Sequence, residues 1–268
     1  MTDHQLGVIG AGNMAEALLR GAISANVIHH NAVIASDPQF SRRQYFTREL
    51  GVTSVEDNAT PAACPRLLLA VKPQVMAGVL AGITPTVAAD ATVISIAAGI
   101  RTQFIHDNLG GKGRIVRVMP NTPMLVGRGA SALCKGPGAD DSDLSWAERL
   151  FAACGKTLRV EEPMIDVVTA LSGSGPAYFF YLIEAMVGAA EAEGMDQAAA
   201  LELAVQTCVG AGELLVRSGE TPHVLRAKVT SPGGTTQAAI ESMEAAGVRE
   251  ALIAAIRRAA ERSRELGK

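Results

Sequence analysis

Two segments in the second half of the chain contain the residue types that bind a small anion. In LSGSGPAYFFYL, residues 171–182, two serines and two glycines lead into a run of large apolar side chains, and VTSPGGTTQAAI, residues 229–240, has the same character. The first turn of a helix exposes backbone amides without helical partners, and nearby hydroxyl groups add further donors. Both segments are therefore expected to hold a carboxylate-bearing ligand. The alternative is a pair of capped helices that bind nothing.

The expected ligand contacts are the small and hydroxyl-bearing residues of these two segments. Pro176 is expected at the first helical position, so that Ser174 and Gly175 flank the helix start. The predicted ligand-binding residues are Ser172, Gly173, Ser174, Gly175, Ser231, Gly233, Gly234, Thr235 and Thr236.

A glycine loop near the N-terminus is typical of dinucleotide binding. Gly10-Ala11-Gly12-Asn13-Met14-Ala15 follows a short apolar run and precedes an amphipathic stretch. In this G-x-G-x-x-A pattern, Gly10 permits a tight turn, Gly12 lets the backbone approach a pyrophosphate, and Ala15 lets helix and strand pack closely. The helix N-terminus adds amides and the positive end of a dipole. Gly10, Ala11, Gly12, Asn13 and Met14 are the expected contacts, with an ordinary strand-to-helix turn as the alternative.

The end of the second predicted strand contains conflicting signals about the cofactor. Asp37 is suited to accept from the free 2′-hydroxyl of NAD, whereas Ser36 with Arg42 and Arg43 is suited to a 2′-phosphate. Asp37-Pro38 is also a good turn, and both arginines are of a type that is usually solvated. We expect NADPH, with NADH as the alternative.

Three further loops follow predicted strands, where ligands bind in α/β sheets. They are AVKP (70–73), AAGI (97–100) and MPNTP (119–123). Pro73 fixes the loop after Lys72, which favours cofactor contact over proton transfer, and Asn121 has an amide that suits a carboxamide or a substrate. The predicted contacts are Ala70, Val71, Lys72, Pro73, Ala97, Ala98, Gly99 and Asn121. A simple turn is the alternative for the last loop.

The pattern of strands and helices predicts two domains. Up to about residue 160, helical stretches alternate with short apolar runs, as in a parallel sheet covered on both faces. The runs are 6–9, 32–35, 67–71, 92–96 and 115–119, with weaker candidates at 130–134 and 157–160. We expect a doubly wound, Rossmann-like α/β domain over residues 1–160. An all-helical domain is expected over residues 161–268, with helices that begin after Asp196 and Thr221.

The first helix of the second domain, expected over 177–193, is apolar nearly all round. A small helical domain offers little interior to bury such a helix, so burial against a second subunit and an obligate oligomer are expected. The alternative is packing against its own α/β domain.

Composition excludes several classes of protein. The 268 residues carry a net charge of −3, which gives no basic field for nucleic acid or anionic lipid. The four cysteines and five histidines show neither disulfide nor metal-ligand spacing, so no metal is expected. The start MTDHQ does not read as a signal peptide, and we find no run of about 18 uncharged apolar residues. A cytoplasmic protein without membrane contact is expected.

The succession of motifs resembles that of the pyrroline-5-carboxylate reductase family over essentially the full length. The motifs are IGAGNMAEA, AVKP, AAGI, MPNTP, EEPMIDVVTALSGSGPAY and VTSPGGTT, in this order. The resemblance implies NAD(P)H-dependent reduction of the cyclic imine 1-pyrroline-5-carboxylate to L-proline, the last step of proline biosynthesis. It also implies a helical dimerisation domain, dimers that commonly assemble into a decamer, and an active site between the Rossmann domain and helices of both subunits.

Matched position by position, the resemblance implies roles for particular residues. Cofactor contacts fall on Gly10–Met14, Ser36, Asn58, Ala70–Pro73 and Ala97–Gly99, and substrate contacts on Glu162, Ser172–Gly175, Thr235 and Thr236. Ser36 matches a serine that binds NADPH in the family, although Asp37 beside it would repel a 2′-phosphate.

The implied chemistry is hydride transfer from nicotinamide C4 to the imine carbon. We expect the Thr236 hydroxyl to bond the ring nitrogen, directly or as proton donor, and Glu162 to stabilise the iminium charge. For Glu162 the alternative is a solvated side chain before Pro163.

Two other functions remain open at this point. A β-hydroxyacid dehydrogenase would use a helix-borne lysine as acid and base, but Lys228 lies just before VTSPGG and outside a K-x-x-N pattern. A non-catalytic, cofactor-sensing oligomer would not need two anion-binding segments.

Overall fold

The computed structural model describes residues 4–267, which form two compact units. Unit 1 runs to Ser174 and resumes at Ala259, and unit 2 comprises Gly175–Arg258. The expectation about MTDHQ falls partly on residues 1–3, which lie outside the described residues.

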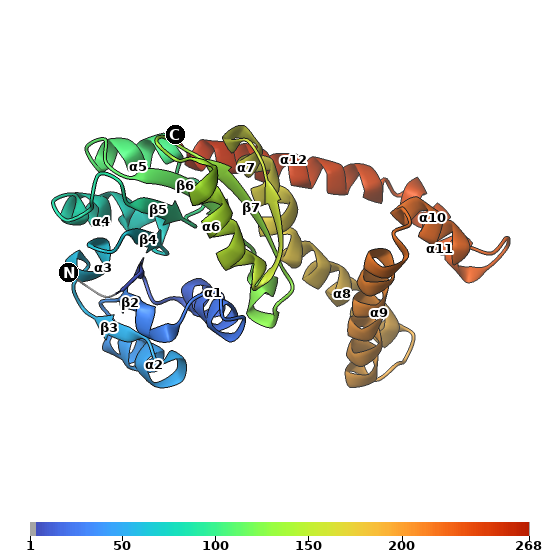
Figure 1. Ribbon diagram of the computed structural model, residues 1–268. Helices are drawn as coiled ribbons and strands as arrows, with labels where there is room; N and C mark the ends of the chain where they lie inside the picture. Colours follow the sequence, from blue (N-terminus) through green and yellow to red (C-terminus); the bar gives the residue numbers. More distant parts are fainter. Residues whose placement is uncertain (1–3, 268) are drawn as a thin grey trace. The chain divides into compact units, whose positions relative to one another are not determined.

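An eight-stranded sheet forms the centre of unit 1 (Figure 1). The strands are β1 Leu6–Ile9, β2 Val33–Ser36, β3 Thr53–Val55, β4 Arg66–Leu69, β5 Thr92–Ser95, β6 Arg114–Met119, β7 Gly129–Lys135 and β8 Gly155–Arg159. Their order is β3-β2-β1-β4-β5-β6-β7-β8, and the pairing is parallel except between β6 and β7. The strand order reverses between β1 and β4, which is the switch point where α/β sheets bind ligands. The predicted doubly wound sheet is confirmed.

Helices cover both faces of this sheet. They are α1 Asn13–Ser24, α2 Phe40–Leu50, α3 Ala59–Ala62, α4 Met76–Ile83, α5 Thr102–Asn108 and α6 Asp141–Ala152. Alternate strand residues point to opposite faces. On one face they form a core with α1, α2 and α6, and on the other a core with α3, α4 and α5.

Unit 2 is helical throughout, as predicted. Its helices are α8 Gly175–Ala192, α9 Gln197–Ser218, α10 Pro222–Lys228, α11 Thr235–Ala245 and the first part of α12 Val248–Leu266, which follow the short α7 Ile165–Val168 of unit 1. The two predicted N-caps are confirmed, because the Asp196 and Thr221 side chains accept from backbone amides in the first turns of α9 and α10. Helices α8 and α9 pack together through Val187, Ala200 and Ala204.

The sequence patterns missed one strand and misplaced some boundaries. The edge strand β3 is three residues long and partly exposed, so it lacks the apolar run by which a buried strand is recognised. The run at 32–35 begins one residue early, because Ala32 ends a 3₁₀ turn, and the run at 67–71 ends at Leu69. Ala70 and Val71 instead begin a loop at the carboxyl edge of the sheet.

The apolar residues of α8 are largely exposed in the single chain. Phe180 is 62% exposed, Tyr181 74% and Leu182 53%, whereas Gly175 and Val187 are the buried residues of this helix. The chain itself therefore leaves most of this apolar surface without cover.

Candidate active site

The predicted cofactor residues lie at one edge of the sheet in unit 1. Gly10–Met14 follow β1, Ser36 ends β2, Ala70–Pro73 follow β4, Ala97–Gly99 follow β5, and Asn121 follows β6. Parallel strands end at the same edge, so the topology gathers these loops at the carboxyl edge across the switch point.

The turn after β1 packs directly against the loop after β4. Gly10 has φ of 99°, its amide donates to the Ser36 carbonyl at 2.8 Å, and the Ala70 amide donates to the Ile9 carbonyl at 2.9 Å. A Cβ at Gly10 would lie 2.6 Å from the Ala70 carbonyl oxygen. Both the positive φ and this close approach therefore require glycine here.

Gly12, in contrast, faces open space. A Cβ at this position would meet no atom within 4 Å, and φ is −77°, which any residue adopts. Gly12 is the N-cap of α1, and no side chain caps the helix. The amides of the first turn and the space beside them therefore suit a pyrophosphate, so the loop fits the predicted dinucleotide.

Asp37 holds the glycine loop in place. Its Oδ2 accepts from the Ala11 amide at 2.8 Å, and its Oδ1 accepts from the Gln39 amide at 2.9 Å. Ser36 is fully buried, and its hydroxyl donates to Asn58 Oδ1 at 2.7 Å. Ser36 and Asp37, which gave conflicting signals about the cofactor, therefore lie in different surroundings. The serine is buried beside Asn58, and the carboxylate of Asp37 holds the glycine loop.

Arg42 is fixed by the chain's own acceptors. Its Nε donates to the Ala11 carbonyl at 2.6 Å, and Nη2 lies 2.8 Å from Glu16 Oε2. Glu16 also accepts from the Tyr45 hydroxyl at 2.7 Å. Burial raises the pKa of Glu16, but the hydrogen bonds from Arg42 and Tyr45 and the charge of Arg42 outweigh it and lower the pKa overall. Arg42 therefore anchors the loop as one half of an ion pair.

Arg43 is also engaged, more loosely. Its Nη1 donates to the carbonyls of Asp37 and Pro38 at 2.8 Å and 2.9 Å, and its Nη2 lies 3.1 Å from Glu56. Glu56 is a surface residue with 76% of its side chain exposed, so this ion pair is readily exchanged for another anion. Arg43 is thus the better placed of the two arginines to receive a 2′-phosphate.

The other predicted cofactor residues have different surroundings. Lys72 is exposed and precedes the 3₁₀ turn Pro73–Val75. Gly99 has φ of 75° and packs against the last turn of α12, because a Cβ added at this position would lie 3.1 Å from Leu266 Cβ. Asn121 is 9% exposed; its amide donates to the Ser172 carbonyl at 3.0 Å, and its carbonyl accepts from the Ala130 amide at 2.8 Å. Asn121 thus joins the loop after β6 to β7 and to the serine segment.

Glu162 forms part of an ionic cluster inside unit 1. Its Oε1 accepts from the Thr102 amide at 2.8 Å and lies 3.2 Å from Arg117 Nη1, and its Oε2 accepts from the Thr102 hydroxyl at 2.7 Å. The Arg117 side chain is only 3% exposed, so Glu162 neutralises a charge that burial would otherwise make very costly.

Arg117 and Thr102 were not predicted from the sequence. The available signal was an arginine inside the apolar strand run IVRVM, which requires a buried acidic partner. Cys134 lies near this cluster; burial, with the negative charge of Glu162, raises the pKa of its thiol to about 12 despite the opposing charge of Arg117. This cysteine is therefore a thiol, not a nucleophilic thiolate.

The serine segment is a π turn and not a simple helix start. The turn covers Thr169–Gly173 and leads through Ser174 into α8, where Pro176 is the second residue. The Ser174 amide donates to the Thr169 carbonyl at 2.8 Å, and the Ser172 hydroxyl donates to the Val168 carbonyl at 3.1 Å. The Ser174 amide is therefore not free as expected, because the π turn supplies its acceptor, although Ser174 and Gly175 do flank the start of α8 as predicted. Single π turns are frequent at functional sites.

The second anion-binding segment has the predicted form. Gly234 is the N-cap of α11, and no side chain caps that helix. Gly233, with φ of 68°, donates its amide to Gln237 Oε1 at 2.7 Å. In the first turn of α11, Thr235 is exposed and Thr236 is half-buried. Their hydroxyl groups therefore lie in the same turn as backbone amides that no side chain caps.

Two other features bear on chemistry. In residues 4–267, no three His, Cys, Asp or Glu side chains are grouped so as to hold a metal ion. Lys228, the residue that a hydroxyacid dehydrogenase would need as acid and base, lies 2.6 Å and 2.7 Å from the two oxygens of Glu220. The amine of Lys228 is therefore held in an ion pair with Glu220.

Two family models match the chain, and related proteins match it over its full length. Residues 162–266 match the pyrroline-5-carboxylate reductase dimerisation family, and residues 5–99 match the family of F420-dependent NADP oxidoreductases. A pyrroline-5-carboxylate reductase of Methanosarcina acetivorans is 42% identical over 100% of both chains. The enzyme of Pisum sativum is 38% identical over 98% of this chain and 96% of its own.

Solved structures agree with these relatives. The pyrroline-5-carboxylate reductase of Coxiella burnetii is 36% identical and superposes with a TM-score of 0.92 over 99% of both chains. The Plasmodium falciparum enzyme, solved with NADP bound, is 29% identical with a TM-score of 0.88 over 100% of both chains.

The different surroundings of two glycines predict opposite effects of an added methyl group. Gly12→Ala should leave the thermal midpoint within about 2 °C, because its Cβ enters open space, but should weaken dinucleotide binding at least tenfold by blocking the pyrophosphate. Gly7→Ala is the contrasting variant, since its Cβ would lie 1.9 Å from the Pro61 carbonyl oxygen, and it should destabilise the fold by about 1–3 kcal/mol or more. Thermal melts and NADPH titrations measure both effects; unchanged affinity in Gly12→Ala would contradict the assignment.

Proposed function

The chain belongs to the pyrroline-5-carboxylate reductase family, and from this membership we propose how its own residues serve the reaction. It is an oxidoreductase that reduces 1-pyrroline-5-carboxylate to L-proline with NADPH or NADH, in proline biosynthesis. The observation that carries this function is 42% identity to a reductase over 100% of both chains.

The cofactor is held at the carboxyl edge of unit 1. When bound, its nicotinamide supplies a hydride to the imine carbon, and a proton on the ring nitrogen completes the amine. Gly10–Met14 surround the pyrophosphate and the loops after β4, β5 and β6 line the rest of the dinucleotide; this assignment is supported by the open space beside Gly12. Ser36, Asn58 and Arg43 lie towards the adenosine ribose, where Arg43 exchanges Glu56 for a 2′-phosphate.

The substrate is held by the two anion-binding segments. The amides and hydroxyls of Ser231–Thr235 bind its carboxylate together with residues Ser172–Gly175, and the Thr236 hydroxyl bonds the ring nitrogen. The uncapped start of α11 and the π turn support these assignments. Because the imine can bind already protonated, the residues need only orient it and exclude water, and no dedicated acid is required.

Glu162 was expected to stabilise the charge of the iminium. Both of its oxygens already accept from Thr102 or pair with Arg117, so a direct contact with an iminium would have to share them. We therefore assign Glu162 a positioning role, in which it fixes the start of α5 and neutralises Arg117, in place of the expected stabilisation of the iminium charge.

Residues 1–160 form the cofactor half, and residues 161–268 form the substrate-binding and dimerisation half. The dimerisation family match, which begins at residue 162, supports this division. The compact units divide the chain differently, with unit 1 running to Ser174 and resuming at Ala259. The reductase works in the cytoplasm, without nucleic acid, and assembles as a homodimer that builds a decamer.

A second copy of the chain is the proposed cover for the apolar surface of unit 2. Helix α9 has the length and mean hydropathy, 1.4, of a membrane-crossing helix. However, Glu213 lies about three turns after Glu202 on the same side, and Arg217 follows about one turn later, which gives α9 a polar stripe. One polar stripe on an apolar helix suits a protein interface better than lipid.

Replacement of Thr236 tests the function together with its chemistry. NADPH oxidation by the unaltered chain should depend on 1-pyrroline-5-carboxylate and yield proline. Thr236→Ala should lower kcat about tenfold or more, because the ring nitrogen loses its positioning bond. Thr230→Ala is the matched control, since that hydroxyl donates to the Arg226 carbonyl of the preceding helix α10, and it should retain kcat. An unchanged kcat in Thr236→Ala would exclude the role of that hydroxyl.

The carboxylate of Asp37 should control the preference between the two cofactors. Asp37→Asn keeps an oxygen for the Ala11 amide but removes a charge that repels a 2′-phosphate. At an effective dielectric constant of about 20, a like-charge pair about 8 Å apart costs about 2 kcal/mol, so the ratio of kcat/KM for NADPH to that for NADH should rise at least tenfold. A ratio that stays constant or falls would place the 2′-phosphate elsewhere.

A charge on α8 should disrupt the assembly. Phe180→Glu places a carboxylate on a residue that is 62% exposed in the single chain. The variant should be a monomer when its size is measured by sedimentation velocity. Leu158→Glu, at a residue 63% exposed on β8 of unit 1, is the control and should remain dimeric. If Phe180→Glu stays dimeric while still binding NADPH, the dimer uses a different surface.

A further inference from the structure

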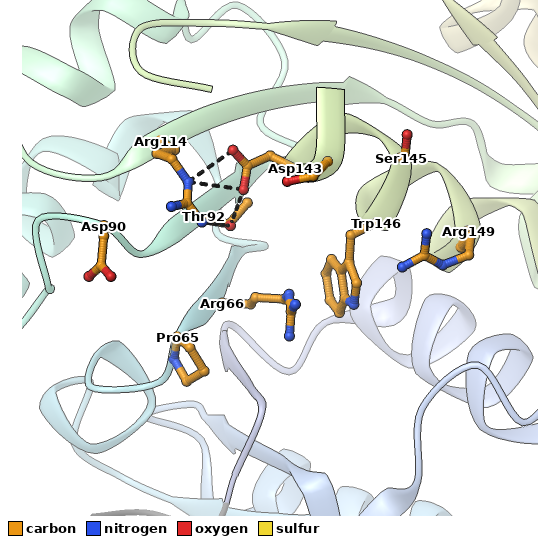
Figure 2. A pocket seen from close by; sticks show the side chains of 10 residues that line it. Pro65, Arg66, Asp90, Thr92, Arg114, Asp143, Ser145, Trp146 and Arg149 are labelled. Atoms are coloured by element: carbon orange, nitrogen blue, oxygen red, sulfur yellow. Dashed lines mark hydrogen bonds and ion pairs between the residues drawn. The ribbon is translucent and has the colours of Figure 1, made fainter. Parts of the chain in front are cut away.

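A pocket of about 440 Å³ opens in unit 1 at the edge of the sheet opposite the cofactor loops (Figure 2). Arg66, Thr92 and Arg114 are the first residues of β4, β5 and β6, so they mark the amino ends of these strands. Helix α6 supplies the other wall with Asp143, Trp146 and other residues. The volume lies within the range of about 300–1,000 Å³ that is typical of small-ligand sites.

The pocket contains more positive than negative charge. Three arginines line it, Arg66, Arg114 and Arg149, against two carboxylates, Asp90 and Asp143. Figure 2 shows Arg114, Thr92 and Asp143 joined to one another, whereas Asp90 lies apart at the rim. One positive charge is therefore left over within the lining.

Asp143 is fully used by its immediate neighbours. Its Oδ2 lies 2.9 Å from Arg114 Nε and accepts from the Asp140 amide at 3.1 Å. Its Oδ1 accepts from the Thr92 hydroxyl at 2.5 Å and from Arg114 Nε at 3.1 Å. With only 3% of Asp143 exposed, these contacts leave it no further capacity to neutralise the other two arginines.

Arg66 and Arg149 have no carboxylate partner among the described residues. The Arg66 guanidinium lies over the Trp146 ring, 4.7 Å from its centroid. Burial lowers the pKa of Arg66, and so do the positive charges of Arg149 and Arg114, with only partial relief from Asp143. In the view of Figure 2 the Trp146 indole lies between the guanidinium groups of Arg66 and Arg149. Arg66 is half-buried and Arg149 is exposed, and cations that repel one another attract an external anion.

We propose that this pocket binds a small oxyanion of the phosphate class, held by the guanidinium groups of Arg66 and Arg149. Guanidinium forks match phosphate geometry with paired hydrogen bonds. The anion lies at the amino ends of strands whose carboxyl ends carry the cofactor loops, so this site is separate from the cofactor and substrate sites. The binder is either free phosphate or the phosphate group of an ester, since both present the same oxygens.

The fluorescence of Trp146 offers a direct test, because it is the only tryptophan in the chain. The full-length protein, saturated with NADP⁺ so that the cofactor site is filled, is titrated with inorganic phosphate, and separately with AMP, at constant ionic strength maintained with sodium chloride. A saturable fluorescence change with a heat of binding in calorimetry supports the site. Competition between the two probes supports one shared site, and tighter binding of AMP identifies a phosphate ester as the better ligand.

Two variants and a control complete the test. Arg149→Gln, at an exposed residue of α6, and Arg66→Gln should each weaken binding about tenfold and leave NADPH oxidation unchanged. Arg48→Gln removes the same charge from the exposed side of α2, outside the lining, and should bind as the unaltered chain does. The site is disproved if neither probe gives a saturable signal or heat up to about 20 mM, if chloride alone reproduces the change, or if Arg149→Gln binds equally well.

Discussion

The close approach of backbones around β1 is the constraint on which the cofactor edge depends. A side chain at Gly7 would collide with the Pro61 carbonyl, and one at Gly10 would collide with the Ala70 carbonyl. β1 pairs with β2 on one side and β4 on the other, at the point where the strand order reverses. Tight packing at Gly7 and Gly10 therefore holds β1 close to its neighbours, while Gly12 faces open space.

Unit 2 is under a different constraint, because it buries little of its own apolar surface. Val187, Ala200 and Ala204 are the buried members of its hydrophobic cluster, and all are small or medium in size. Larger residues such as Leu203 and Leu214 remain 59% and 51% exposed in the single chain. Apolar burial contributes about 25 cal/mol per Å², so this unit gains much of its stability from association. Under the proposed dimer, folding of unit 2 and assembly are then coupled.

The sequence was most informative where one residue type serves one physical purpose. The glycine loop, the N-caps Asp196 and Thr221 and the buried parallel strands follow from local rules, and each was correctly predicted. The edge strand β3 was missed because exposure removes the apolar pattern. The π turn at Thr169–Gly173 was missed because the acceptors of its amides lie in the preceding helix, which no pattern of serine and glycine encodes. Likewise, the pairing of Glu162 with Arg117 spans 45 positions and depends on tertiary structure.

The two arginines of β6 show that charged residues within one strand can have different electrostatic surroundings. Arg114 and Arg117 are three residues apart and so point to opposite faces of the sheet. Arg117 is 3% exposed and pairs with Glu162, whose remaining acceptors are taken by Thr102, so its charge is balanced inside the protein. Arg114 pairs with Asp143 in the same manner, but Arg66 and Arg149 share its pocket and have no acid to balance them. The first cluster therefore stabilises the fold that positions the active site, whereas the second keeps an excess positive charge available to a ligand.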